Sequence, residues 1–121
     1  MTELASTMTL REIASQAAAA IRALNDLTLD GGELTGPGEV RDVIASLEVM
    51  GHGLPQLYEQ LARFLVARYE DGQVAHDSSP DPGRLVTEVT EALTTAGQAA
   101  DMMTAALDEA HYASVELRTA R

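Results

Sequence analysis

The sequence predicts an all-α protein, an elongated antiparallel helical hairpin or bundle of three to four helices. Apolar residues recur at steps of three and four over most of the chain, which is the spacing of an amphipathic helix. With one Phe, three Tyr and no Trp, the core must be filled by small aliphatic side chains, and these favour helix against helix. At 121 residues, we expect a single helical-bundle domain spanning residues 1–121.

The chain is organised around its last helix, which we expect to run from Arg84 to Arg118. This Ala-rich helix carries a heptad row whose steps are four and then alternately three and four. The row comprises Leu85, Val89, Ala92, Ala96, Ala99, Met103, Ala106, Ala110, Ala113 and Leu117. A second row repeats every seven residues beside it: Val86, Leu93, Ala100 and Leu107. Because the first row is mostly alanine, a partner helix can approach closely there.

The first helix begins at a capping box and is expected to end near Leu27. In Thr9-Leu10-Arg11-Glu12, the side chains of Thr9 and Glu12 can each accept a hydrogen bond from an otherwise unpaired amide. The apolar stripe of this helix comprises Leu10, Ile13, Ala17, Ala20, Leu24 and Leu27. This periodicity predicts an amphipathic helix that faces a core.

The next helix opens at Pro37 and meets two glycines and a proline between Gly51 and Pro55. Those residues should break or kink a helix. Nevertheless, the three–four spacing continues across them, through Val40, Val43, Leu47, Met50, Leu54, Leu57, Leu61 and Phe64. We therefore expect either two helices on one axis, the later one running from about Leu54 to Glu70, or one helix kinked near Gly51–Pro55.

The turn-rich segment from Asp71 to Pro82 predicts the tip of a hairpin, because the helical segments on its two sides have nearly equal lengths. The first helix is shorter and would cover only about half of one hairpin face. Since exposed apolar strips of that size are rare on monomers, we expect a homo-oligomer or a helical protein partner. The expected interface residues are Ala92, Ala96, Ala99, Met103, Ala106 and Ala110.

The composition of the chain argues against several classes of function. The net charge of −11 argues against direct nucleic-acid binding, which needs a basic face. The chain has no cysteine and therefore no thiolate chemistry. No apolar run approaches the length of a membrane span, and the N-terminus does not have the pattern of a signal peptide, so we expect a cytoplasmic protein without a membrane partner.

The candidate chemical residues do not form a recognisable active site. His52 lies at the glycine–proline segment, His76 in the loop, and His111 three residues after Asp108. Zinc sites need more ligands at characteristic spacings, so we interpret Asp108 and His111 as a surface pair. No serine lies in a nucleophile motif. We therefore expect no catalytic residue, no metal and no cofactor, and a protein that is not an enzyme.

Tyr112 and Glu116, four residues apart near the end of the last helix, resemble the Tyr-x-x-x-Asp/Glu export signal of small helical WXG-type proteins. Those proteins are short acidic helical hairpins. This chain has no Trp-x-Gly motif, and its inter-helix loop is long. The resemblance implies a secreted helical-hairpin protein as an alternative function.

A second resemblance covers most of the chain. The blocks Thr9–Ala14, Ile21–Asn25 and Leu54–Leu57, together with the Asp81-Pro82 entry into an Ala-rich helix, resemble small helical proteins of actinobacteria. The absence of lysine beside eight arginines fits the coding bias of such high-GC bacteria. Those proteins often accompany conjugative or integrative elements. The resemblance therefore implies an accessory role there for a non-enzymatic interaction or scaffold protein.

Overall fold

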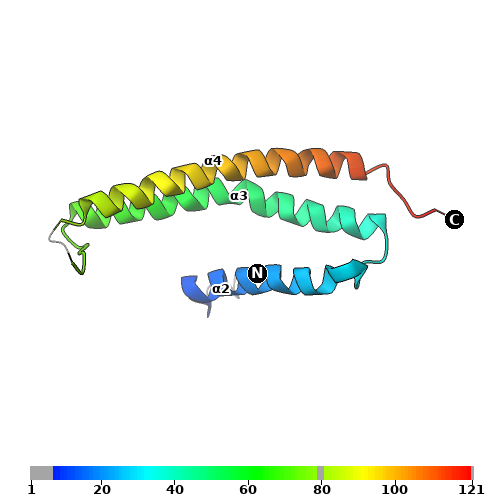
Figure 1. The fold of residues 1–121 in the computed structure, drawn as a ribbon, viewed down its shortest axis with the longest axis horizontal. Helices are drawn as coiled ribbons and strands as arrows, with labels where there is room; N and C mark the ends of the chain where they lie inside the picture. Colours follow the sequence, from blue (N-terminus) through cyan, green and yellow to red (C-terminus); the bar gives the residue numbers. More distant parts are fainter. Residues whose placement is uncertain (1–6, 79–80, 121) are drawn as a thin grey trace.

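The computed structural model describes residues 7–78 and 81–120, and the described part is all-helical. Its elements are α2 (Leu10–Thr28), the 3-10 turn η1 (Leu29–Gly31), α3 (Pro37–Glu70) and α4 (Gly83–Ser114). Figure 1 shows α3 and α4 side by side along their whole length, with α2 beside the first half of α3. The three helices lie roughly in one layer.

The antiparallel hairpin predicted from the sequence is confirmed. The helices α3 and α4 contain 34 and 32 residues, which correspond to roughly 51 and 48 Å of helix. The segment that joins them begins at Asp71 and ends at Pro82, as expected, although Ser79 and Pro80 lie outside the described residues. Their nearly equal lengths allow the two helices to pair from end to end.

The helix α3 is continuous from Pro37 to Glu70 and contains Pro55. The alternative of two separate helices is therefore wrong, while a bend of the axis near Gly51–Pro55 remains a prediction. Pairing with α4 accounts for the continuity, because Gly51 is buried against the side chain of Thr104. Similarly, a β-carbon added at Gly97 would lie 3.8 Å from the Cα of Pro55. Small residues thus admit the close approach of α4 at both irregular positions.

The contact between α3 and α4 uses the second row of α4, not its alanine-rich first row. We assign to this contact the buried or half-buried residues that recur at steps of three and four along one side of α4, which are Val86, Thr90, Leu93, Gly97, Ala100, Thr104, Leu107, His111 and Ser114. The corresponding residues of α3 are Arg41, Ile44, Glu48, Gly51, Pro55, Tyr58, Ala62 and Leu65. Of the six expected interface residues, only Ala96 is half-buried; Ala92, Ala99, Met103, Ala106 and Ala110 are exposed.

The apolar row of α3 and the alanine-rich first row of α4 instead lie together on one side of the hairpin. Within the two helices, each member of these rows precedes a contact residue by one position, which rotates it by about 100° around its helix. Because the helices run antiparallel, these rotations bring both rows to the same side. We call this side the apolar face: Val40, Val43, Leu47, Met50, Leu54, Leu57, Leu61 and Phe64 of α3, with Leu85, Val89, Ala92, Ala96, Ala99, Met103, Ala106 and Ala110 of α4.

The opposite side of the hairpin is polar. Residues that follow the contact positions by one include Gln56, Glu59 and Arg63 on α3 and Gln98 and Asp101 on α4. These five side chains line one shallow groove, which confirms that residues from both helices meet on this side. The hairpin therefore has one apolar face and one polar face.

The helix α2 begins and ends close to the predicted positions. Its capping box is formed: the Thr9 hydroxyl accepts a hydrogen bond from the Glu12 amide at 3.1 Å, and the Glu12 carboxylate accepts one from the Thr9 amide at 2.9 Å. The apolar stripe of α2 is exposed, however, apart from half-buried Leu24. Leu24 lies beside Val43 and Leu47 of the apolar face. Because the rest of the stripe is bare, α2 covers this face only in part.

The ends of α4 differ slightly from the sequence prediction. The helix begins at Gly83 with Pro82 as its N-cap, while the carboxylate of Asp81 accepts a hydrogen bond from the Gly83 amide at 2.9 Å. The helix ends at Ser114, four residues before the expected Arg118. The Ser114 hydroxyl donates to the His111 carbonyl at 2.7 Å, and such side-chain bonds compete with the helical pattern.

Two glycine substitutions test the close approach of the helices. In Gly51→Ala the new β-carbon would lie 2.5 Å from the Thr104 hydroxyl, so we expect a net destabilisation of about 1 kcal/mol, the overpacking cost exceeding the gain in helix propensity. Gly53→Ala is the matched control, because nothing lies within 4 Å of its added carbon. It should stabilise the protein by about 0.5–1 kcal/mol. Chemical denaturation measures both, and equal effects would contradict the α3–α4 contact.

The capping box makes α2 sensitive to acid. Hydrogen bonds from the backbone and then the side chain of Thr9 lower the pKa of Glu12. Its contribution to helix stability is therefore present above the ordinary glutamate pKa and is lost as the pH falls through the lowered value. Glu12→Gln keeps the acceptor without the titration. Carbon chemical shifts of α2 should show acid-induced loss of helix in the wild type and less loss in Glu12→Gln; equal losses would contradict this role.

Candidate functional site

Two features of the hairpin are candidates for function, and the first is the apolar face. None of its sixteen residues carries a charge, although the whole chain has a net charge of −11. Several of its larger side chains remain open to solvent, including Phe64 at 65% and Met103 at 43% exposure. At one end, the guanidinium of Arg68 lies over the Phe64 ring, 5.4 Å from its centroid. Such a surface is suited to contact with another apolar surface.

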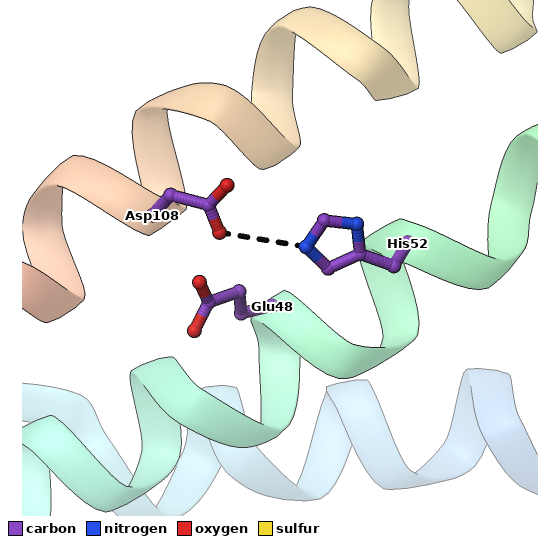
Figure 2. A group of neighbouring side chains, drawn as sticks. All are labelled: Glu48, His52 and Asp108. Atoms are coloured by element: carbon purple, nitrogen blue, oxygen red, sulfur yellow. Dashed lines mark ion pairs between the residues drawn. The ribbon is translucent and has the colours of Figure 1, made fainter.

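The second feature is a His–carboxylate cluster, which comprises Glu48 and His52 of α3 and Asp108 and His111 of α4. Figure 2 shows Glu48, His52 and Asp108 with their polar groups pointing toward one another across the two helices. One potential ligand atom from each of these three residues lies within 4.8 Å of the others. Each helix supplies one histidine and one carboxylate, four residues apart on α3 and three apart on α4. These spacings place both side chains on the same side of their helix.

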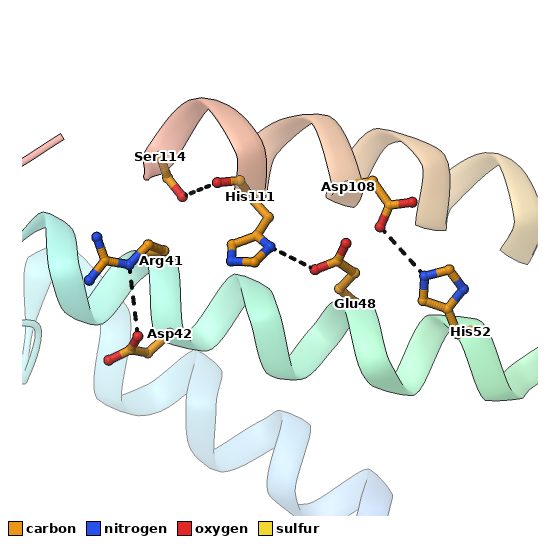
Figure 3. A network of polar contacts seen from close by, with 7 residues as sticks. All are labelled: Arg41, Asp42, Glu48, His52, Asp108, His111 and Ser114. Atoms are coloured by element: carbon orange, nitrogen blue, oxygen red, sulfur yellow. Dashed lines mark hydrogen bonds and ion pairs between the residues drawn. The ribbon is translucent and has the colours of Figure 1, made fainter. Parts of the chain in front are cut away.

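Two ion pairs join α3 to α4 within the cluster (Figure 3). The His111 Nδ1 atom lies 3.0 Å from Glu48 Oε1, and the His52 Nε2 atom lies 3.5 Å from Asp108 Oδ1. Glu48 is the most enclosed member, with its side chain 19% exposed, whereas the His52 side chain is 63% exposed. The cluster is thus open to solvent on the side of His52 and closed at Glu48.

The electrostatics of the cluster are dominated by its two carboxyl groups. The pKa of Glu48 is raised above its ordinary value, first by hydrogen bonding with the Asp108 carboxyl, then by desolvation and the negative charge of Asp108. The two histidines oppose this rise. The Asp108 Oδ1 atom is buried and makes no hydrogen bond, although it lies 3.5 Å from His52 Nε2. The cluster therefore brings two carboxyl groups close to each other and to two imidazole rings.

Sequence analysis named three of the four members of this cluster but did not predict which of them face one another. Asp108 and His111 were expected to form a surface pair, and His52 was assigned only to the glycine–proline segment. The structure does not pair Asp108 with His111; each instead faces a residue of α3. Glu48 was not recognised as a candidate. The four-residue step from Glu48 to His52 is a weak signal that becomes informative only once α4 lies opposite.

The remaining candidates lie apart from the cluster. His76 is in the loop, where its Nδ1 atom accepts a hydrogen bond from the Ser78 amide at 2.9 Å. Tyr112 lies in the last turn of α4 and is 81% exposed. Glu116 follows the end of that helix, so the two residues do not share one helical face.

Comparison with protein-family models, with curated proteins and with solved structures found no match. Within the described residues, no helix combines the length and the apolar character that would be needed to cross a membrane.

Proposed function

We propose that this chain is a non-enzymatic helical interaction protein that pairs with a second copy of itself through the apolar face. The observation that carries this proposal is an extended surface without charges on a strongly acidic chain. In the proposed homodimer, two antiparallel hairpins form a four-helix core, with the axis of α3 bent near Gly51–Pro55. The alanine-rich row, including Ala92, Ala99 and Ala106, allows close helix–helix contact.

The accessible surface supports a partner. The chain exposes 9540 Å², whereas a compact protein of 12.9 kDa exposes about 6,300 Å². The excess of roughly 3,200 Å² is several times the ~800 Å² per partner that a standard interface buries. Val86 and Ala100 are the only buried apolar side chains among the described residues. A second copy would supply the missing burial.

The distribution of charge also favours a second copy as the partner. Like-charge repulsion opposes association of two chains of net charge −11, so the contact must exclude acidic residues. The apolar face satisfies this condition, while residues such as Glu59 and Asp101 point to the polar face. Added salt should therefore strengthen the dimer by screening the repulsion.

Matched alanine substitutions on α4 test the interface. Ala99→Glu places a carboxylate in the centre of the apolar face, whereas Ala105→Glu places one on the polar face, and both alanines are exposed in the single chain. We expect light scattering to give about 26 kDa for the wild type and Ala105→Glu, twice the 12.9 kDa of the chain. Ala99→Glu should give the monomer mass, because burying an unpaired charge is costly. A wild-type monomer at near-millimolar concentration would refute the dimer.

Within this proposal the protein acts in the cytoplasm as an accessory factor of a conjugative or integrative element. The acidic polar face supports a role away from nucleic acid, because phosphate binding requires basic side chains. Identification of proteins co-purified with the tagged chain from its native host tests this context. Recovery of conjugation proteins with the wild type would support it, and their equal recovery with an unrelated acidic helical protein would refute it.

Secretion as a WXG-type helical-hairpin protein is the second candidate function. The observation in its favour is the exposure of Tyr112, at 81%, on an acidic helical hairpin. Its weakness is the position of Glu116 beyond the end of α4.

A secretion assay distinguishes the two candidates. If Tyr112 belongs to an export signal, the wild type should appear in the culture medium and Tyr112→Ala should remain in the cells. Tyr58→Ala, which alters a half-buried tyrosine of the hairpin contact, controls for loss of fold. Absence of the wild-type protein from the medium, or equal export of Tyr112→Ala, would eliminate the secreted alternative.

A further inference from the structure

We propose that Glu48, His52 and Asp108 bind a divalent first-row transition-metal ion of the Zn²⁺ class, with His111 orienting Glu48. This site is separate from the proposed dimer interface. It also differs from the sequence prediction of no metal, because its ligands come from two helices and have no characteristic spacing along the sequence.

The donor set fits such an ion. Imidazole nitrogen with carboxylate oxygen suits borderline metals such as Zn²⁺, whereas Mg²⁺ and Ca²⁺ prefer oxygen donors alone. Three protein ligands leave a fourth position for water, as is common in open zinc sites. The two carboxylates would neutralise the charge of the ion.

The geometry fits as well. Tetrahedral bonds of about 2.0–2.2 Å place neighbouring donor atoms about 3.3–3.6 Å apart. The His52 Nε2 and Asp108 Oδ1 atoms are 3.5 Å apart. The third donor, from Glu48, lies within 4.8 Å of the other two, so small side-chain rotations complete the site. Figure 2 shows the three groups converging on one point between α3 and α4.

A further observation concerns one oxygen of Asp108, whose side chain as a whole is 46% exposed. Its Oδ1 atom is buried without a hydrogen-bond partner, and buried polar atoms in proteins are normally satisfied. A metal ion held between Asp108 and His52 would satisfy this atom directly. The same ion would relieve the repulsion between the carboxyl groups of Asp108 and Glu48.

His111 would not bind the ion itself but would orient the ligand Glu48. Its Nδ1 atom lies 3.0 Å from Glu48 Oε1, which orients the carboxylate that would bind the ion (Figure 3). Outer partners of this kind orient metal ligands, and their removal typically weakens affinity about 10- to 100-fold. Because α3 would supply two ligands and α4 one, a bound ion would link the two helices near the middle of the hairpin.

Calorimetric titration with Zn²⁺ and absorption spectroscopy with Co²⁺ test the site on the full-length chain. We expect one ion per chain, Co²⁺ d–d bands of a site with few ligands, and no competition from Mg²⁺. His52→Ala should weaken Zn²⁺ binding at least 100-fold, and His111→Ala about 10- to 100-fold. The matched control is His76→Ala, which removes the loop histidine and should bind as the wild type does.

Nuclear magnetic resonance of the imidazole groups supplies a second readout. Zn²⁺ should shift the ring signals of His52 and His111 and leave those of His76 unchanged. Circular dichroism confirms the fold of each variant. No Zn²⁺ binding by the wild type at millimolar metal, or equal binding by His52→Ala, would overturn the proposal. The dimer variant Ala99→Glu should still bind Zn²⁺, so failure of one proposal does not imply failure of the other.

Discussion

The close approach of α3 and α4 around Gly51 determines most other features of the molecule. The contacts of Gly51 with Thr104 and of Gly97 with Pro55 set the register in which the two helices pair. That register places Glu48 and His52 opposite His111 and Asp108. It also fixes which side of each helix is turned inward. The apolar face and the His–carboxylate cluster are both consequences of this single helix–helix contact.

The helical elements were predictable because they depend on local chemistry. The capping box at Thr9, Pro37 in a first turn and the turn-rich segment after Glu70 each act on neighbouring backbone groups. The rotation of α4 was not predictable, because its two apolar rows are adjacent and either could face α3. Ala99 and Ala100 have the same apolar side chain, yet only Ala100 is buried in the hairpin.

The His–carboxylate cluster was beyond sequence reasoning for a different reason. Its two residues on α3 and its two residues on α4 are about half the chain apart in the sequence. Each pair alone resembles an ordinary solvated helix face. Only the pairing register brings the four side chains together. Because the cluster opens beside the polar face and the proposed dimer uses the apolar face, the two surfaces can be altered independently.

The sparse core has a consequence for how this protein melts. Among the described residues, Val86 and Ala100 are the only buried apolar side chains of the chain, and α2 contributes none. Too little apolar surface is removed from water within one chain to hold the hairpin firmly. If two copies pair through the apolar face as proposed, folding and pairing become one equilibrium, in which the melting temperature rises with protein concentration. The amount of protein in the cell would then decide the fraction that is folded.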